Sequence, residues 1–274
     1  MENKYALILG ASSGFGGAAA IELAKNGYNI IGIHLDRQVT IPNVNQIIKK
    51  IEKNHRKGLF FNINAADQIK RNDVLDEITE RSSGEDKIKI NVLIHSLAFG
   101  TLKPFITLKP EDGINKAQME MTLDVMAHSL VYWTQGLVQR GLLAKNARII
   151  ALTSAGSQTV IPSYGAVSAA KAAVESHIRY LSVELGSMGV TANAIMAGVT
   201  DTPALRKIPG SDMMLSSAKL KNPMGRLTTP EDVAKAIICL CDEKSDWISG
   251  NVIGVDGSEY RVNYMGEKVC KNIK

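Results

Sequence analysis

The chain has 274 residues, a formal net charge of +5 and a hydrophobic content of 45%, which fit one large globular domain. This composition excludes a disordered chain, a collagen-like repeat and a small disulfide-stabilised scaffold. The mild positive charge permits acidic partners, but without basic clusters interleaved with aromatic residues we expect no nucleic-acid binding. No apolar run approaches the length of a membrane span, and no apolar segment with a cleavage site opens the chain, so we expect a cytoplasmic protein.

Short β-branched runs alternate with longer stretches of helical periodicity along the whole chain. The expected strands are Tyr5–Leu9, Asn29–Ile33, Gly58–Ile63, Asn91–His95, Arg148–Thr153, Thr191–Ile195 and Val252–Val255. The expected helices cover residues 14–26, 43–54, 67–82, 111–142, 164–187 and 230–242. Alternation of this kind, with strands that are continuously apolar, predicts an α/β fold with a doubly wound parallel sheet and helices on both faces. No linker divides the chain, so we expect a single domain over residues 1–274.

A glycine-rich turn follows the first expected strand directly, and a helix of small residues follows the turn. In an open α/β sheet, ligands bind beyond the carboxyl ends of the strands. Glycines there let the backbone approach a pyrophosphate, and the helix N-terminus supplies free N–H groups. An ordinary tight turn is the alternative, but the position favours a dinucleotide site. The residues expected to form it are Gly10, Ser12, Ser13, Gly14, Phe15 and Gly16.

The end of the second strand carries Asp36 and Arg37, which offer charges of both signs to a cofactor. An acidic residue here binds the ribose hydroxyl groups, whereas a basic residue accepts a 2′-phosphate. Asp36 can bind the ribose or pair with Arg37, and Ser12 and Ser13 can hydrogen-bond a phosphate. We therefore expect NADPH or NADH as the cofactor, with a slight preference for NADPH.

Tyr164 and Lys171 are seven residues apart at the start of an expected helix, so they lie two turns apart on one helical face. An ammonium near a phenol lowers the pKa of the phenol, and it can also hold the ribose of a cofactor. Ser154 follows an apolar strand, from which its hydroxyl can face the same cleft. We predict that Tyr164, Lys171 and Ser154 are catalytic; a buried tyrosine and a surface lysine without function are the alternative.

These motifs resemble the short-chain dehydrogenase/reductase superfamily, and the resemblance extends over nearly the whole chain. It rests on the spacing G-x-x-x-G-x-G, on Pro223-Met224-Gly225-Arg226 before Pro230-Glu231-Asp232, and on Ile248-Ser249-Gly250 before Val255-Asp256-Gly257. The resemblance implies a Rossmann-type fold. It also implies that further residues contact the cofactor, namely Asn62, Ile63, Ser96, Leu97, Ala98, Val199, Thr200 and Thr202, together with Arg37 and Lys171.

The catalytic spacing is more specific. Most relatives carry Tyr-x3-Lys, but that tyrosine position is Val167 here, and Tyr164 to Lys171 gives Tyr-x6-Lys, which resembles the enoyl-acyl-carrier-protein reductases. Ser154 stands where many of those enzymes have a second tyrosine. The resemblance implies NAD(P)H-dependent reduction of the 2,3 double bond of an enoyl thioester, bound to acyl carrier protein or coenzyme A. A carbonyl or β-ketoacyl reductase and a non-catalytic cofactor-binding protein are the alternatives.

The remaining expectations concern the lid, the histidines, the cysteines and assembly. The segment 199–224 is rich in proline and methionine, and we interpret it as a substrate lid. Its basic residues either face an acidic carrier or are surface charges without a role. His95 is expected to line the site, no metal site is expected, and the cysteines are expected to be reduced. The resemblance implies a homo-oligomer, a tetramer, formed through helices 111–142 and 164–187. Interface or core packing is open for Met119, Met121, Met126, Leu130 and Trp133.

Overall fold

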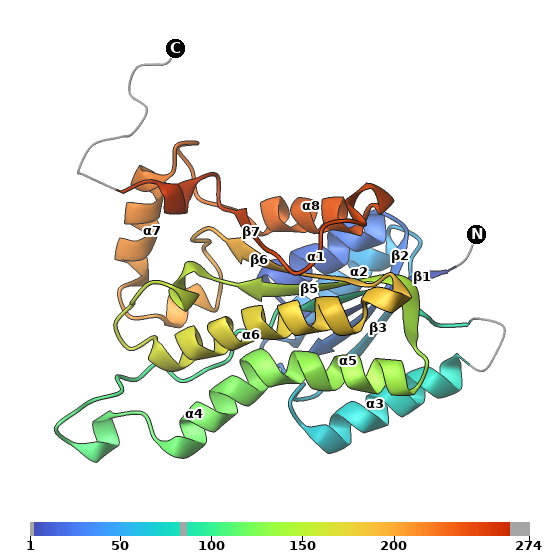
Figure 1. Ribbon diagram of the computed structural model, residues 1–274, viewed down its shortest axis with the longest axis horizontal. Helices are drawn as coiled ribbons and strands as arrows, with labels where there is room; N and C mark the ends of the chain where they lie inside the picture. Colours follow the sequence, from blue (N-terminus) through green and yellow to red (C-terminus); the bar gives the residue numbers. More distant parts are fainter. Residues whose placement is uncertain (1–2, 83–86, 264–274) are drawn as a thin grey trace, which may run out of the picture.

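The computed structural model describes residues 3–82 and 87–263. Within them, seven strands form one parallel sheet in the order β3-β2-β1-β4-β5-β6-β7 (Figure 1). The strands are β1 (Lys4–Leu9), β2 (Tyr28–His34), β3 (Gly58–Asn62), β4 (Ile90–His95), β5 (Leu143–Thr153), β6 (Thr191–Ala197) and β7 (Val252–Val255). The predicted doubly wound parallel sheet is confirmed, because each apolar run became a strand covered on both faces.

Helices cover both faces of the sheet, and each face has its own apolar cluster (Figure 1). One face packs against α1 (Gly14–Lys25), α2 (Ile41–Glu52) and α8 (Pro230–Cys241). The other packs against α3 (Gln68–Arg81), α5 (Ser129–Gln139) and α6 (Gly165–Glu184). Two further helices, α4 (Lys116–Leu123) and α7 (Ser211–Lys221), lie toward one end of the molecule.

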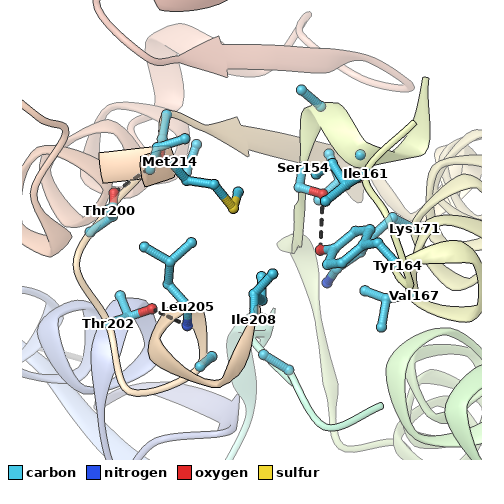
Figure 2. A pocket seen from close by; sticks show the side chains of 18 of the residues that line it. Ser154, Ile161, Tyr164, Val167, Lys171, Thr200, Thr202, Leu205, Ile208 and Met214 are labelled. Carbon is cyan, nitrogen blue, oxygen red and sulfur yellow. Dashed lines mark hydrogen bonds between the residues drawn. The ribbon is translucent and has the colours of Figure 1, made fainter. Parts of the chain in front are cut away.

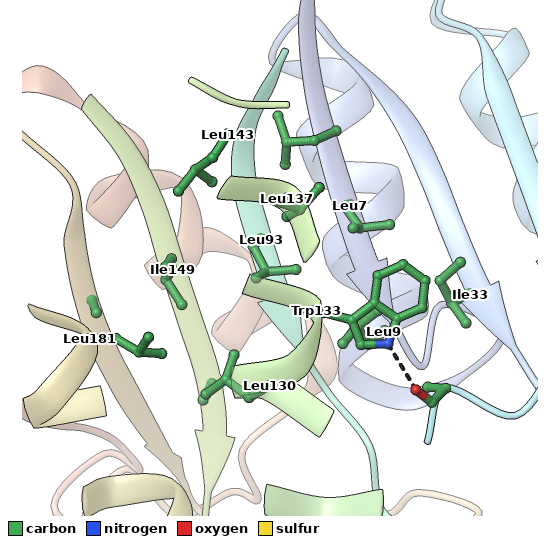
Figure 3. Packing of buried hydrophobic residues seen from close by; sticks show 14 of the residues in the cluster. Leu7, Leu9, Ile33, Leu93, Leu130, Trp133, Leu137, Leu143, Ile149 and Leu181 are labelled. Atoms are coloured by element: carbon green, nitrogen blue, oxygen red, sulfur yellow. Dashed lines mark hydrogen bonds between the residues drawn. The ribbon is translucent and has the colours of Figure 1, made fainter. Parts of the chain in front are cut away.

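Trp133 occupies the centre of the cluster under α5, where it is fully buried among leucines and isoleucines of the sheet (Figure 3). Its indole N–H donates a hydrogen bond of 2.9 Å to the carbonyl oxygen of Ala65, so the polar atom of this buried ring is satisfied. Met126 and Leu130 are buried in the same cluster. Trp133, Met126 and Leu130 therefore pack in the core of the subunit. The other tryptophan, Trp247, lies between α8 and the outer strand β7 and is 99% exposed.

The helical stretch predicted over 111–142 forms, but it is shorter than expected and contains an irregular turn. A short 3-10 turn, Pro110–Asp112, comes first, and α4 then begins after Asn115, whose side chain forms a capping box with Gln118. The helix next widens into a π-helical turn, Asp124–His128, before α5 begins. The Ser129 hydroxyl donates to the Val125 carbonyl oxygen at 2.8 Å across this turn. The chain is thus helical without a break from Lys116 to Gln139, with wider π-type hydrogen bonding at Asp124–His128.

The sheet changes its winding direction at β1, because β2 lies on one side of it and β4 on the other. The crevice beyond the carboxyl ends of such neighbouring strands is where an open α/β sheet binds ligands. The chain also contributes the ends of β5 and β6 to the same edge of the sheet. This topology brings the predicted site residues from all parts of the sequence to one region.

Several smaller expectations have direct outcomes. Cys239 is exposed and Cys241 is half-buried, with neither in a disulfide, whereas Cys270 lies outside the described residues. His128 and His177, expected on helix surfaces or an interface, are half-buried and contact each other at 3.1 Å between Nδ1 and Nε2. In the part of the chain that the structure describes, no helix is long and apolar enough to cross a membrane.

Candidate active site

The glycine-rich turn forms a cradle that excludes side chains. Gly10 has φ +89°, and a Cβ atom there would lie 2.5 Å from the carbonyl oxygen of Ser96. At Gly16 a Cβ would lie 2.1 Å from the carbonyl oxygen of Gly10. α1 begins at Gly14, and the Ser13 side chain makes no capping hydrogen bond to its first turn. The free N–H groups of this helix end and the close backbone packing fit a pyrophosphate group.

The end of β2 places Asp36 beside this cradle. Its carboxylate lies 3.0 Å from Nδ1 of His34, so Asp36 pairs with His34 and the expected alternative of pairing with Arg37 is wrong. Burial raises the pKa of Asp36, but hydrogen bonds from the side chains of Thr40, Ser12 and His34 outweigh burial and lower it below its ordinary value. Asp36 is therefore a carboxylate at neutral pH. Arg37 is exposed.

Asn62, at the end of β3, holds the backbone of residue 36 from the other side. Its Oδ1 accepts from the Asp36 N–H at 2.9 Å, and its Nδ2 donates to the Asp36 carbonyl oxygen at 3.0 Å. The two bonds together fix the turn after β2 against β3. Asn62 therefore orients the loop that carries Asp36, and Ile63 follows it as a half-buried residue.

The end of β4 meets one expectation and corrects another. Ser96, Leu97 and Ala98 line the principal cavity, as the resemblance implied. His95 does not line it, because its ring turns into the core, is fully buried and lies 2.9 Å from the Ser129 hydroxyl through Nε2. Burial, reinforced by the nearby Lys171 charge, lowers the pKa of His95 to about 3. His95 is thus a neutral core residue that ties β4 to the start of α5.

Tyr164, Ser154 and Lys171 point into one cavity, which Figure 2 shows from close by. Tyr164 caps the start of α6, Ser154 follows β5, and their hydroxyl oxygens are 3.4 Å apart. Burial raises the pKa of the Tyr164 phenol, and the hydrogen bond with Ser154 opposes part of the rise. The phenol thus remains protonated at neutral pH and can donate a hydrogen bond.

Lys171 is almost completely buried at the floor of this cavity. Its ammonium donates to the Leu152 carbonyl oxygen at 2.7 Å and to the Leu97 carbonyl oxygen at 3.5 Å. Burial lowers the pKa of Lys171 to about 8, and the Glu175 charge one turn further along α6 opposes part of the fall. An ammonium has three N–H donors, so one remains to hold a ribose hydroxyl group.

The turn after β6 presents Val199, Thr200 and Thr202 to the same cavity. The Thr200 hydroxyl donates to the Gly198 carbonyl oxygen at 2.9 Å, and the Thr202 hydroxyl accepts from the Leu205 N–H at 3.2 Å. The hydroxyl groups of both threonines therefore form hydrogen bonds within the turn itself. Thr202 also lies within van der Waals distance of a Cβ built on Gly14, so this turn faces the glycine cradle.

The segment predicted as a lid forms the wall opposite Tyr164 (Figure 2). Leu205, Ile208 and Met214 point into a cavity of about 670 Å³, and α7 gives the segment a regular helix that the sequence analysis did not anticipate. Arg206, expected on a basic rim, is instead paired with Asp201 and Asp212 at 2.6 Å each. Lys207 and Lys219 are exposed and Lys221 is half-buried, and of the three Lys207 and Lys221 line the cavity.

Sequence reasoning missed two residues of the cavity, Glu259 and Tyr260. They belong to the turn after β7, and β7 is the neighbour of β6, so parallel pairing alone places this turn beside Val199. In residues 3–82 and 87–263, no group of three or more His, Cys, Asp or Glu side chains is arranged to hold a metal ion.

Comparisons with known proteins place the chain among reductases. The family model described as Enoyl-(Acyl carrier protein) reductase matches residues 10–257. The chain is 26% identical over 280 residues to the enoyl-[acyl-carrier-protein] reductase [NADH] FabI of Aquifex aeolicus. The alignment covers 100% of this chain and 98% of that protein. It is also 25% identical over 257 residues to the 3-oxoacyl-[acyl-carrier-protein] reductase FabG of Thermotoga maritima, covering 94% and 98% of the two chains.

Solved structures show the same fold. The crystal structure of the Aquifex aeolicus enoyl reductase superposes with a TM-score of 0.81 at 23% identity, covering 96% of this chain and 99% of that chain. The enoyl reductase of Anaplasma phagocytophilum, solved in complex with NAD, superposes with a TM-score of 0.80 at 20% identity, covering 100% and 97%. Since the family model spans the glycine cradle, Tyr164, Lys171 and the end of β7, the chain belongs to the enoyl-(acyl carrier protein) reductase family of short-chain dehydrogenase/reductases and is an oxidoreductase of that superfamily.

Proposed function

We propose that this enzyme reduces the 2,3 double bond of an enoyl thioester with NADH or NADPH. One observation carries the proposal: the cavity holds a phenol at Tyr164 and the aliphatic side chain of Val167 one turn further along α6. Three residues along a helix correspond to about 4.5 Å. The hydroxyl donor thus stands about one turn from the place where a ketone-reducing relative carries it.

The distance matters because the two reactions develop charge at different atoms. A ketone takes hydride on the carbon that bears the oxygen to be protonated. An enoyl thioester takes hydride at Cβ, the electron pair of the double bond moves toward the carbonyl, and negative charge collects on the thioester oxygen. This oxygen is three bonds from the carbon that accepts hydride, whereas in a ketone it is one bond away. Tyr164, as a protonated phenol, donates a hydrogen bond to this oxygen and stabilises the enolate, which then takes a proton at Cα.

The cofactor supplies the hydride when it is bound. The cradle of Gly10 and Gly16 would hold the pyrophosphate, Lys171 would hold the ribose, and backbone groups of Val199 would hold the carboxamide. Asp36 is placed for the adenosine ribose. The apolar residues Leu205, Ile208 and Met214 cover the acyl chain and keep water from the reacting carbons.

A carbonyl or β-ketoacyl reductase remains the second candidate, because Ser154 lies 3.4 Å from Tyr164, where a serine can bind a carbonyl oxygen. A non-catalytic cofactor-binding role gives no reason for Tyr164, Ser154 and Lys171 to share the cavity.

The test compares crotonyl thioester with acetoacetyl thioester under identical conditions, with oxidation of NADH and of NADPH followed for each. Reduction of crotonyl thioester at the higher kcat/KM is the expected result. A higher kcat/KM on acetoacetyl thioester would assign the protein to the ketoreductases, and turnover of neither would favour a binding role.

A further inference from the structure

His34, the last residue of β2, is buried beside the carboxylate of Asp36. Its side chain is 5% exposed, and its Nδ1 lies 3.0 Å from Oδ2 of Asp36. The imidazole ring also lies 6.1 Å from the ring of Phe60 on β3, measured between centroids. A carboxylate accepts hydrogen bonds and has none to donate, so the hydrogen of the contact belongs to Nδ1. His34 is therefore a buried donor that orients Asp36.

Further hydrogen bonds join Asp36 to the glycine cradle. The side chains of Ser12, which belongs to the cradle, and of Thr40 also bind its carboxylate. A carboxylate has sites for about four hydrogen bonds, so one remains for a ligand. Asp36 lies 20 residues after Gly16, the spacing at which the acidic residue of a dinucleotide-binding fold reaches the ribose 2′-hydroxyl. The charge at Asp36 therefore acts on the group that a cofactor carries at its 2′ position.

The charged groups around His34 are few. On the face of β2 that carries His34 and Ile30, the sheet packs against α1 and α2, and neither helix has a charged residue in its first two turns. β3 has no charged residue, and the one on β1, Lys4, stands at the opposite end of that strand. Arg37, on the same turn as Asp36, is exposed and always charged. Histidine changes its charge between about pH 5 and pH 8, so the charge of the pair depends on His34.

We infer that His34 determines how strongly Asp36 discriminates against the 2′-phosphate that distinguishes NADPH from NADH, an inference that rests on the cofactor placement of the proposed function. A neutral His34 leaves the carboxylate with its full negative charge, which repels the phosphate. A protonated His34 keeps the same hydrogen bond through Nδ1 but cancels the charge of the pair, so the repulsion falls. The preference for the cofactor without the phosphate should therefore increase as pH rises.

The experiment measures the dissociation constants of NAD and NADP by isothermal titration calorimetry at about pH 5.5 and about pH 8, near the two ends of the range in which histidine changes its charge. The oxidised cofactors carry the same adenosine half as the reduced ones and are stable in acidic buffer. The variant is His34→Asn, whose amide keeps an N–H near the place of Nδ1 without a charge.

At the acidic pH, the ratio of Kd for NADP to Kd for NAD should be roughly fivefold higher in His34→Asn than in the wild type, the scale of one well-screened unit charge at several ångströms. At the alkaline pH, where His34 is neutral, the two proteins should have the same ratio. A role of His34 in the shape of the turn alone would not depend on pH in this way.

Other titrations do not imitate this result. The 2′-phosphate itself takes up a proton near about pH 6, but this acts equally in both proteins. Lys171 titrates at about 8, but it acts on both cofactors and cancels in the ratio. His55→Asn is the matched control, because it removes an exposed histidine at a φ of +56°, which asparagine tolerates, and it should leave both ratios unchanged. His34→Gln, which also lacks a titrating ring, repeats the measurement if His34→Asn does not fold.

Equal ratios in the wild type and His34→Asn at the acidic pH would overturn the inference. A ratio that changes by the same factor at both pH values would also overturn it, because His34 would then only support the shape of the turn. Failure of the wild type to bind NAD and NADP would instead overturn the cofactor placement of the proposed function. A wild type that shows the expected ratios but reduces only acetoacetyl thioester would leave the inference about His34 standing and would correct the substrate.

Discussion

At the scale of single residues, Tyr164 is the proposed hydrogen-bond donor of the cavity, since burial raises the pKa of its phenol and keeps it protonated. Tyr164→Phe removes one hydrogen bond to the developing oxyanion, so kcat should fall roughly ten- to a thousandfold. The Kd for cofactor should stay unchanged, since Lys171 and the glycine cradle remain. Steady-state kinetics and calorimetry measure the two quantities. Ser154→Ala is the comparison: loss of turnover there, with Tyr164→Phe fully active, would make Ser154 the donor.

Lys171 predicts a pH dependence of cofactor binding. Its pKa of about 8 lies below the ordinary value of 10.5, so the ammonium loses its proton, and with it a donor to the ribose, as pH rises through about 8. We expect the Kd for cofactor to rise above that pH. Over the window between the two pKa values the unfolded chain binds more protons at this group, so the contribution of Lys171 to stability rises with pH. Weaker binding therefore does not reflect unfolding at Lys171.

Glu175→Gln is the matched variant for that titration. The Glu175 charge opposes the effect of burial on Lys171, so its removal should lower the pKa of Lys171. The pH above which the Kd for cofactor rises should then move to a lower value. Calorimetric titrations between about pH 6 and pH 9.5 locate this pH. The same value in both proteins would show that a different group titrates.

Asp36 predicts the direction of a change in cofactor preference. Its carboxylate stands beside the cradle and repels a 2′-phosphate, whereas it accepts hydrogen bonds from ribose hydroxyl groups. Asp36→Asn should therefore lower the KM for NADPH relative to that for NADH. The ratio of kcat/KM for the two cofactors measures this. An unchanged ratio would place the 2′ position away from Asp36, closer to Arg37.

At the scale of elements, α7 and the segment before it define the mouth of the cavity. Arg206 is neutralised by Asp201 and Asp212, which leaves Lys207 and Lys219 as the exposed cations beside the apolar wall. Charge on such a rim acts mainly on the rate of association with an acidic partner.

Reversing Lys219 to glutamate should lower kcat/KM for an acyl-carrier-protein substrate, and the loss should be greater at low salt. The same acyl group on a small neutral thioester should react as before, because Lys219 is exposed and does not line the cavity. Lys244→Glu, an exposed reversal outside α7 that also does not line the cavity, is the control. Equal losses on both substrates would mean that Lys219 supports the fold of α7 and does not recognise the carrier.

The π turn between α4 and α5 shows where prediction of elements from sequence fails. Apolar periodicity continues through Asp124–His128, so the pattern favours one helix over 111–142. At the π turn the Ser129 hydroxyl contacts both the Val125 carbonyl oxygen and His95 of β4. His95 lies 34 residues away in sequence. A contact of that kind is decided by tertiary packing and leaves no local signal.

At the scale of the whole molecule, the seven strands and their arrangement in a doubly wound parallel sheet could be predicted, because β-branched runs separated by helical periods allow few other topologies. The glycine cradle and the pair Tyr164 and Lys171 could be predicted because their spacing is local. His95 was misplaced, since the end of a strand does not reveal which face its side chain takes. Glu259 was missed because its place in the cavity depends on the pairing of β7 with β6.

Assembly remains a prediction. Tyr180 and Val183 lie one turn apart on α6 and are 67% and 80% exposed, which is unusual for neighbouring large apolar residues. If α6 packs against a second copy of the chain, Val183→Glu should lower the mass measured by sedimentation velocity. Ile69→Glu, on the exposed side of α3, should leave the mass unchanged. An unchanged mass in both variants would place the subunit contact elsewhere.

The two tryptophans of this chain occupy opposite environments, and this gives the protein two separate optical reporters. Trp133, fully buried and hydrogen-bonded to Ala65, should emit at short wavelength and resist quenching by iodide. Trp247, almost fully exposed, should emit as it does in water and be quenched readily. Iodide will therefore quench the emission of Trp247 and leave the emission of Trp133 as a measure of core integrity. A subunit that covers the outer edge of β7 would shield Trp247, so the fraction of light that iodide removes would report assembly while the protein stays folded.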